Sequence, residues 1–493
     1  MSADWPIVRL EDITSILGDG LHGTPKYDEN GEYFFINGNN LSNGKIVVNE
    51  KTKRATKDEF LKHRKQLNDR TVLVSINGTL GNVALYHGEK VFLGKSACYF
   101  NVNENIDRDY IRYVMSGSLF QNYIHSLATG STIKNVSLKL MRDFSFSLPP
   151  LEEQRKISKI LKNLDDKIEL NRQTNQTLEQ IAQAIFKSWF VDFEPTRAKL
   201  QVRTSVAEGR MPGSDRKLPS NFTKEDENHL VERAAMAAIS GKSLEEINKL
   251  CEENDVQGST NVAGSGSAGA MLKQLKETAA LFPDALVESE LGEIPEGWGV
   301  TKLGNIIEFN PKRTLRKGEL APYLDMKNVP TQGHLAEDVY LREMKSGTKF
   351  INGDTLLARI TPCLENGKTA YVDFLEVGQV AWGSTEYIVM RPKGGRPMSL
   401  GYLIARLDSF RAKAIQTMTG TSGRQRANAK ALSEQYWIDY PCELLDRFDL
   451  VASNYLNKAK INGDENKTLS VLRDGLLPKL LSGEININTE IAA

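Results

Sequence analysis

The chain has no long hydrophobic run, although 40% of its 493 residues are hydrophobic. No stretch approaches the roughly 18 apolar residues that a membrane-spanning helix needs, and the first residues have neither the basic nor the apolar part of a secretory signal. Net charge is also missing, because 63 Lys and Arg balance 63 Asp and Glu. This balance argues against a general polyanion binder. We therefore expect a cytoplasmic protein of ordinary globular composition.

Cysteine is scarce and histidine is scattered. The four cysteines contain no Cys-x-x-Cys pair, so no zinc site is predicted and reduced thiols are the default. The six histidines show no metal-ligand spacing and are expected to be surface or hydrogen-bonded side chains. The chain also lacks a phosphate-binding Gly-x-x-x-x-Gly-Lys-Ser/Thr loop and a His-Glu-x-x-His pair. We therefore expect a non-catalytic protein that binds no metal and no cofactor of its own.

What the chain does contain is a loose internal repeat, with a spacing of about 290 residues. Residues 5–10 (Trp-Pro-Ile-Val-Arg-Leu) correspond to residues 298–303 (Trp-Gly-Val-Thr-Lys-Leu). In each half, short β-like runs punctuated by turns precede a helical segment with heptad spacing. Two similar units joined by matching helices predict a pseudo-twofold molecule, which suits a roughly twofold partner such as duplex DNA.

The changes of pattern along the chain set the predicted boundaries. We predict an α+β fold with two repeated mixed-β domains, at 1–148 and 296–441. Long helices follow them at 149–194 and 442–493, the second including the C-terminal tail, and a linker with a small helical insertion occupies 195–295. The first domain has 18 Lys and Arg against 16 Asp and Glu, and the second has 20 against 15. These local excesses are compatible with DNA contact.

Apolar residues recur every seven positions in both long helices, which predicts a coiled-coil seam. Two Asn residues interrupt each seam near its middle, as expected if the two helices pair in antiparallel fashion; the alternative is that these Asn side chains are exposed where the seam loosens. Pro478 is expected to kink or end the second helix. The predicted helix-pairing residues are Ile157, Leu161, Leu164, Ile168, Asn171, Asn175, Leu178, Ile185, Phe448, Tyr455, Asn462, Asn466 and Leu469.

Contact with double-stranded DNA requires cationic and amide side chains on loops that rigid elements hold in place. The loops at 129–135 and 419–426 recur at the same place in both halves, and polar residues also follow two buried strands, at 77–79 and 359–361. The alternative for each loop is a solvated turn. The candidate DNA-binding residues are Asn77, Thr79, Thr129, Ser131, Thr132, Lys134, Asn135, Arg359, Thr361, Thr419, Thr421, Ser422, Arg424, Gln425 and Arg426. A basic cluster of Lys51, Lys53, Arg54 and Lys57 either contacts the DNA backbone or is simply a solvated face.

Five sequence runs carry a resemblance to a known family. They are Leu-Pro-Pro-Leu-Glu-Glu-Gln-Arg-Lys-Ile at 148–157, Ser-Trp-Phe-Val-Asp-Phe at 188–193, Leu-Gly-Glu-Ile-Pro-Glu-Gly-Trp at 291–298, Gly-Asp-Thr-Leu-Leu-Ala-Arg-Ile-Thr-Pro-Cys at 353–363, and Gly-Ser-Thr-Glu at 383–386. In their order and spacing they resemble the specificity subunits of prokaryotic Type I restriction–modification systems. The match covers most of the chain outside 200–290, where the sequence departs from the compact linker of the family.

The resemblance implies a subunit with two target-recognition domains held apart by two antiparallel helices, each domain reading one half of a split, asymmetric DNA site. It further implies two modification subunits, which methylate adenine with S-adenosylmethionine, and two restriction subunits, which use ATP and Mg to translocate and cleave DNA. Two other functions stay open: a fused methyltransferase or nuclease, which the missing catalytic motifs disfavour, and a coiled-coil scaffold that binds only protein.

Overall fold

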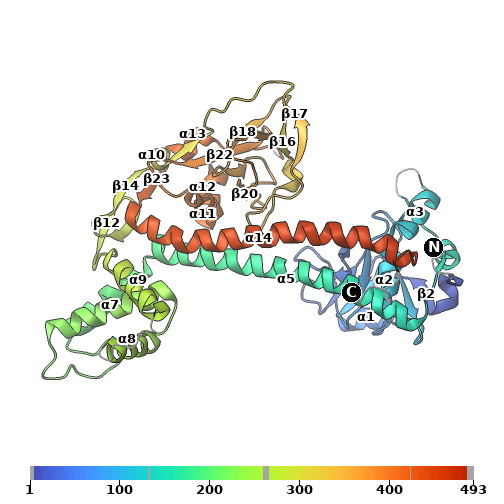
Figure 1. Cartoon of the computed structure of the whole chain (residues 1–493), viewed down its shortest axis with the longest axis horizontal. Coiled ribbons are helices and arrows are strands. Elements are labelled where there is room, and N and C mark those ends of the chain that lie inside the picture. Colours follow the sequence, from blue (N-terminus) through green and yellow to red (C-terminus); the bar gives the residue numbers. More distant parts are fainter. Residues whose placement is uncertain (1–4, 131–133, 259–265, 422, 486–493) are drawn as a thin grey trace. The chain divides into compact units, whose positions relative to one another are not determined.

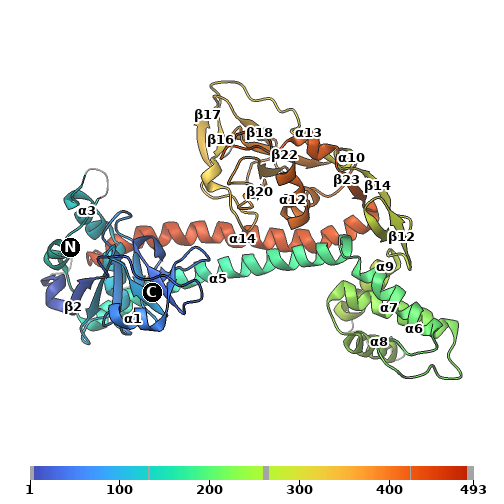
Figure 2. The same ribbon diagram turned by 180° about the vertical axis from the view of Figure 1, so that it is seen from behind.

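The computed structural model describes residues 5–130, 134–258, 266–421 and 423–485. The chain forms two compact units, one built from Met1–Leu170 with Glu465–Ala493 and the other from Asn171–Asp464. Figures 1 and 2 follow the chain by colour and element label. Two helices of 40 residues, α5 (Leu151–Phe190) and α14 (Cys442–Leu481), each contribute one part to each unit.

The first unit contains a mixed-β domain built around an antiparallel four-stranded sheet of order β2-β10-β7-β8. A three-stranded sheet of order β6-β3-β9 adds one parallel pair, between β3 and β9. The strands are β1 (Ile7–Arg9), β2 (Thr14–Asp19), β3 (Tyr33–Ile36), β4 (Leu41–Ser42), β5 (Lys45–Ile46), β6 (Arg54–Ala55), β7 (Thr71–Ser75), β8 (Val83–Leu85), β9 (Val91–Leu93), β10 (Ala97–Val102) and β11 (Ser145–Ser147). The helices are η1 (Leu10–Ile13), η2 (Gly38–Asn40), α1 (Lys57–His63), α2 (Arg108–Ser116), α3 (Ser118–Leu127) and α4 (Leu138–Asp143).

The second unit contains a domain of the same plan. Its antiparallel sheet has the order β15-β22-β19-β20, and its second sheet, of order β17-β16-β21-β18, again contains one parallel pair, between β16 and β21. The strands are β12 (Leu286–Ser289), β13 (Gly292–Pro295), β14 (Gly299–Lys302), β15 (Ile307–Phe309), β16 (Leu320–Leu324), β17 (Tyr340–Glu343), β18 (Thr348–Phe350), β19 (Thr355–Ala358), β20 (Thr369–Tyr371), β21 (Ala381–Gly383), β22 (Tyr387–Pro392) and β23 (Tyr436–Asp439). The helices of this domain are α10 (Leu303–Ile306), η3 (Met326–Asn328), α11 (Ser399–Arg406), α12 (Asp408–Gln416) and α13 (Ala429–Ser433).

The repeated domains predicted from the sequence are therefore confirmed. In both, a central strand of apolar and small residues, β7 or β19, is buried along its whole length, as expected for a strand covered on both faces. The terminal strands also match, because β1 pairs with β11 and β14 pairs with β23. Each domain thus closes on itself by joining its entry strand to its exit strand.

Each domain carries a broken helix where the sequence pattern indicates a continuous one, near 109–127 and 400–418. The first is divided into α2 and α3 at Gly117, and the second into α11 and α12 at Leu407. Both dividing residues have extended backbone angles. The apolar spacing continues across each break because both short helices bury their apolar side chains in the same core, so periodicity alone does not reveal the break.

The helices α5 and α14 form an antiparallel pair within each unit, which confirms the predicted coiled coil. In the second unit, Asn175 lies beside Asn462, whereas the Phe186 ring packs 5.5 Å from the Phe448 ring. In the first unit, Leu480 near the end of α14 joins the core that contains Ile157 and Leu161. None of the predicted pairing residues is exposed. Pro478 is predicted to kink or end this helix, but it lies inside α14, which continues to Leu481.

The Asn residues of the seam are not exposed where the helices loosen. Asn462 is 4% exposed, and its side-chain amide donates to Asn175 Oδ1 over 2.9 Å. The Asn175 amide donates in turn to the backbone oxygen of Ala459, also over 2.9 Å. A polar pair at this point of an apolar seam fixes the register, because any shift of one helix would leave the amides without partners.

Residues 195–295, predicted as a linker with a small helical insertion, carry four packed helices and a β-hairpin of β12 and β13. The helices are α6 (Glu194–Ala207), α7 (Lys224–Ser240), α8 (Leu244–Gly258) and α9 (Gly266–Ala280). Their apolar side chains, including Met236 and Leu272, are continuous with the core around Trp189 and Phe190. The segment is therefore a helical subdomain that shares its core with the second unit.

An aromatic cluster joins the helix pair to the second domain. The buried ring of Phe190 lies 5.0 Å from Tyr440, 5.4 Å from Phe448 and 6.2 Å from Trp298. Phe190 ends α5, Trp298 precedes β14, Tyr440 lies between β23 and α14, and Phe448 lies in α14. The cluster explains the apolar content of the Ser-Trp-Phe-Val-Asp-Phe run, which ends one helix and builds the core beside it.

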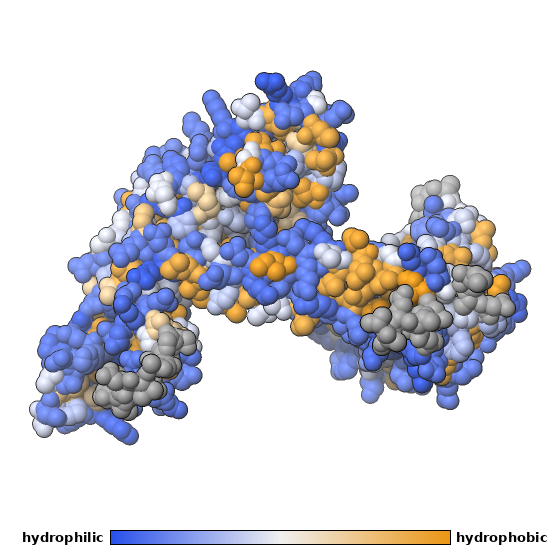
Figure 3. All heavy atoms as spheres, viewed as in Figure 1, coloured by the Kyte–Doolittle hydropathy of each residue, from blue (hydrophilic) through white to orange (hydrophobic). Residues whose placement is uncertain are grey.

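Apolar side chains are also found on the surface of α14. Leu450, Ile461, Val471 and Leu472 are exposed, and patches of apolar surface follow the helix in Figure 3. Among the residues that the structure describes, no helix is both long and apolar enough to cross a membrane.

We predict that Asn175→Ala lowers the thermal stability of the full chain. The substitution leaves the buried Asn462 amide without its acceptor, which costs about 1–3 kcal/mol. Calorimetric melting would measure the loss, with Asn454→Ala as the matched control, because Asn454 is an exposed Asn on α14, the helix that carries Asn462. Equal melting temperatures for both variants would contradict this role of the polar pair.

Candidate nucleic-acid interface

In the first domain, the loop at 129–135 is closed by its own backbone. Thr129 and Asn135 exchange two backbone hydrogen bonds, of 2.9 and 2.8 Å. The loop then pairs with the segment that follows β7, because Gly78 N–H donates to the Lys134 carbonyl over 3.0 Å. The Asn77 side-chain amide donates to Asn135 Oδ1 over 3.3 Å. The candidate residues Ser131 and Thr132 lie outside the described residues.

The second domain repeats this closure with different side chains. Thr419 and Arg426 exchange backbone hydrogen bonds of 3.1 and 2.9 Å. Thr361 N–H donates to the Gln425 carbonyl over 3.0 Å, which pairs the loop with the segment after β19. The predicted residue Ser422 lies outside the described residues, and Thr421 is exposed.

The structure therefore brings together, within each domain, two candidate segments that the sequence identified separately. Asn77 and Gly78 lie against Lys134 and Asn135, and Ile360 and Thr361 lie against Gln425 and Arg426. The isolated β-bridges correspond as well, with Asn135 bridged to both Asn77 and Thr129, and Arg426 to both Ile360 and Thr419. Such a site displays short, exposed side chains on a rigid frame, which is the arrangement that base-edge contacts require.

The three candidate arginines of the second domain differ in the partners of their side chains. The Arg426 guanidinium donates to both carboxylate oxygens of Glu386, with Nε–O distances of 2.9 and 3.0 Å. This hydrogen bonding raises the pKa of Arg426 and directs its side chain back onto the domain. Arg424 is exposed and makes no side-chain hydrogen bond or ion pair with any residue that the structure describes. Arg359 is half-buried, and its Nε has no hydrogen-bond partner among the described residues.

Glu386 is a residue that sequence reasoning missed as part of the site. Its backbone oxygen accepts from Arg359 N–H over 2.9 Å while its carboxylate binds Arg426. Glu386 ends the Gly-Ser-Thr-Glu run, so the sequence drew attention to this residue but did not reveal that Arg426 is its partner. In the first domain the same position is held by Ser96, whose carbonyl accepts from Ile76 N–H and whose hydroxyl donates to Asn37. One domain thus supports its loops with an ion pair, and the other with neutral groups.

In the basic cluster, Arg54 lies on β6, Lys51 and Lys53 precede this strand, and Lys57 begins α1. Lys51, Lys53, Arg54 and Lys57 are all exposed, and the Arg54 guanidinium lies 4.6 Å from the centre of the Phe34 ring. The second domain has a counterpart that the sequence did not reveal. Arg342 on β17 lies 4.6 Å from the Tyr323 ring centre, and β17 pairs with β16 as β6 pairs with β3. Identifying it required knowledge of the strand pairing.

A buried charged cluster connects α5 to the second domain. Glu179 accepts a hydrogen bond from the Tyr402 hydroxyl, and His334 Nδ1 lies 3.5 Å from Glu179 Oε2. The other His334 ring nitrogen lies 3.5 Å from Asp373 Oδ2. Burial opposes the charge on His334, but the two carboxylates outweigh it and raise its pKa. Burial likewise opposes the charge on Glu179, yet the hydrogen bond from Tyr402 and the nearby charges of Arg406 and His334 lower its pKa.

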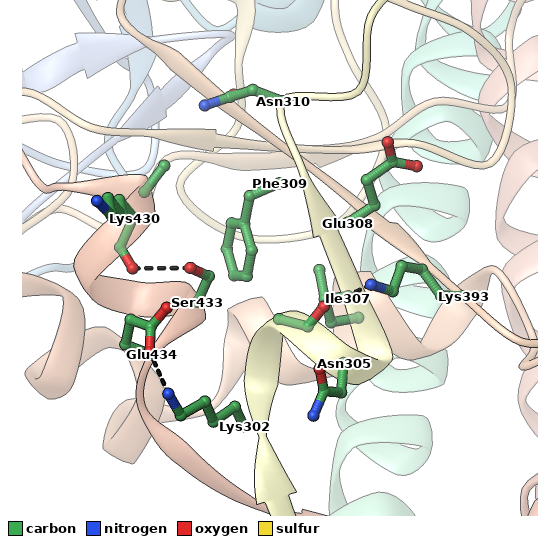
Figure 4. A pocket seen from close by; sticks show the side chains of 12 residues that line it. Lys302, Asn305, Ile307, Glu308, Phe309, Asn310, Lys393, Lys430, Ser433 and Glu434 are labelled. Carbon is green, nitrogen blue, oxygen red and sulfur yellow. Dashed lines mark hydrogen bonds and ion pairs between the residues drawn. The ribbon is translucent and has the colours of Figure 1, made fainter.

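A pocket of about 500 Å³ opens between β15, α10 and α13 in the second domain. Figure 4 shows the Phe309 ring in its middle. Its polar groups are engaged with one another, because Lys302 pairs with Glu434 over 2.5 Å and Lys393 Nζ donates to the Gly304 carbonyl over 2.6 Å. No group of three or more potential metal ligands occurs among the residues that the structure describes. The Ser433 hydroxyl in the pocket lining donates to the Lys430 carbonyl over 2.7 Å.

Comparisons with known proteins find Type I restriction enzyme specificity subunits among the relatives of this chain. Residues 2–180 match the family model of the Type I restriction modification DNA specificity domain. The chain is 29% identical to the Type I restriction enzyme HindI specificity subunit of Haemophilus influenzae, over 72% of each chain. It is 33% identical to the EcoEI specificity subunit of Escherichia coli, over 30% of this chain and 26% of that one. The S subunit of a Type I system from M. genitalium aligns over 98% of this chain and 97% of its own, with 15% identity and a TM-score of 0.46. The chain is thus similar to Type I restriction enzyme specificity subunits over most of its length.

We predict that the contribution of His334 to stability depends on pH. Because its pKa is raised in the folded protein, its stabilising effect is full below the unfolded value of about 6.5 and is lost as pH rises through the folded value. His334→Gln should therefore lower the melting temperature more at about pH 6 than at about pH 8.5. A deficit that is the same at both pH values would show that His334 stays neutral beside Glu179 and Asp373.

Proposed function

We propose that this chain is the sequence-specific DNA-binding subunit of a Type I restriction–modification complex in a prokaryotic cytoplasm, and that it reads a bipartite, asymmetric site in double-stranded DNA. The observation that carries the proposal is the shared loop closure in the two domains. One frame recurs, with two candidate segments paired by backbone hydrogen bonds, and each domain places its own polar side chains on that frame.

The side chains at corresponding positions support an asymmetric site. Lys134 and Asn135 in the first domain correspond to Gln425 and Arg426 in the second, by their hydrogen bonds with the partner segment. An amide such as Asn suits the paired donor and acceptor of adenine, whereas an exposed Arg such as Arg424 suits guanine or phosphate. Two domains with different contact groups would read two different half-sites.

The chemistry is assigned to partner subunits. We propose that this chain is non-catalytic and directs two modification subunits, which methylate adenine with S-adenosylmethionine, and two restriction subunits, which cleave DNA with ATP and Mg. The rival function is a coiled-coil scaffold that binds protein without DNA specificity. The exposed apolar residues of α14 would serve either function, so the paired loops are the feature that favours DNA recognition.

The decisive experiment is to express the chain with its modification partner in a host without DNA methylation and to map methyladenine across the genome. We expect one split motif with a spacer of fixed length, because two separate domains read it. A contiguous motif would contradict the two-domain reading. A stable complex that methylates nothing would support the scaffold.

We predict that Arg424→Ala in the assembled complex weakens binding to the target by about 1–3 kcal/mol, the typical value of one good arginine contact to a base. If the contact is to a base, discrimination at one position of the motif should relax; if it is to phosphate, the salt dependence of binding should decrease. Lys458→Ala is the matched control, because it removes an exposed cation on α14. Unchanged binding of the Arg424 variant across salt concentrations would remove Arg424 from the interface.

A further inference from the structure

Helix α5 carries a carboxylate that binds the first domain inside the first unit. Asp165 Oδ2 accepts from Arg112 Nη2 over 2.6 Å and from the Tyr113 hydroxyl over 2.8 Å. Its other oxygen accepts from Arg473 Nη1 of α14 over 2.9 Å. Burial opposes the charge of Asp165, but these hydrogen bonds lower its pKa, so the group is ionised and fully engaged.

A second carboxylate of the same helix binds the second domain inside the second unit. Glu179, which is 5% exposed, accepts from the Tyr402 hydroxyl, and Arg406 Nε donates to that hydroxyl over 2.9 Å. The Arg406 Nε also lies 3.8 Å from Glu179 Oε1. Burial strongly raises the pKa of Tyr402, which keeps the hydroxyl protonated as a donor.

The two contacts share one chemistry. In each unit an α5 carboxylate meets a tyrosine hydroxyl and an arginine from the first short helix of the broken helix, α2 or α11. In both domains that helix packs against the central sheet, α2 beside β7 and β8 and α11 beside β19, β20 and β22. Residues 77–79 lie in the connection between β7 and β8. Residues 359–361 lie in the connection between β19 and β20.

Hydrogen bonds continue from these helices to the candidate loops. Arg406 donates to the carbonyls of Gly367 and Thr369, over 2.9 and 3.0 Å, where the chain enters β20 after the loop that begins at Arg359. In the first domain, Gln121 of α3 donates to the Gly81 carbonyl over 2.9 Å, in the turn that carries Asn77 and Thr79, and to Met115 of α2 over 2.8 Å. The α5 carboxylates are thus two or three contacts away from the loops.

Carboxylates that are buried, like Glu179, or half-buried, like Asp165, are costly to desolvate and add little net stability, but they define one geometry, because any displacement leaves a charge unpaired. An apolar contact would tolerate sliding of the domain on the helix, whereas a carboxylate with two or three donors does not. This distinction matters for a protein whose loops must meet base edges within hydrogen-bonding distance.

We propose that Asp165 and Glu179 are positioning residues for DNA recognition: each fixes the domain of its own unit on α5, so that its loops are held in register for one half of the target. The inference rests on the proposed function. Its particular consequence is that the two carboxylates act on different halves of the same site.

The test uses the complete complex of this chain with its modification subunits and the motif found by methylome mapping. Methylation rates are measured on duplexes in which each base of both half-sites is substituted in turn. We expect Glu179→Gln to reduce discrimination about tenfold, equivalent to about 1.4 kcal/mol, in the half read by the second domain, and to leave the other half within about twofold. Asp165→Asn should give the reciprocal pattern.

The controls separate positioning from general stability. Asp166→Asn removes an exposed carboxylate next to Asp165 that pairs only with Lys162 among the described residues and should change neither half. Tyr402→Phe deletes a single hydroxyl and should reproduce Glu179→Gln in milder form; it decides the matter if the Glu179 variant does not assemble. Loss spread equally over both half-sites, or discrimination unchanged in both, would overturn the inference. A wild-type complex that methylates no sequence would instead refute the proposed function.

Discussion

The antiparallel pairing of α5 with α14 is the interaction on which the rest of the structure depends. Neither mixed-β domain completes its core from its own residues. The first is closed by Leu480, from the far end of the chain, and the second by Phe186 and Phe190, which precede it by more than a hundred residues in the sequence. Because these cores draw on both helices, the seam that aligns the helices also determines how each domain is built. The Asn175–Asn462 pair fixes that alignment within the second unit.

Much of this fold could be predicted from the sequence because its signals are local or repeated. Heptad spacing gave the two long helices, and the correspondence of the two halves gave the repeated domains. The breaks at Gly117 and Leu407 were not predictable, since the apolar pattern runs through them and only the shared core explains them. The helices within 195–295 were underestimated for a related reason: α7 buries small residues such as Ala235 in the core that also contains Trp189 and Phe190, and small residues give a weak periodic signal.

The candidate site, like the fold, could be predicted from the sequence only in part. The loops could be recognised in the sequence because they recur in both halves. The residues that support these loops could not be recognised. Tyr402 and Glu179 are 223 positions apart, and Arg426 and Glu386 are 40 apart. A sequence shows that such residues are charged or polar and says nothing of which carboxylate meets which donor. The six histidines had looked equivalent for the same reason, although His334 is 2% exposed between two carboxylates.

The way the loops are built explains how one frame can serve different sequences. Their closure uses backbone N–H and carbonyl groups, which almost every residue supplies, so side chains at the tip can change without loss of the frame. The supports differ accordingly: an ion pair of Arg426 with Glu386 in the second domain and a neutral Ser96–Asn37 pair in the first. A frame fixed by the backbone and oriented by the α5 carboxylates leaves the exposed side chains unconstrained by folding. Two copies of such a frame in one chain can therefore diverge independently, which is what reading two unlike half-sites requires.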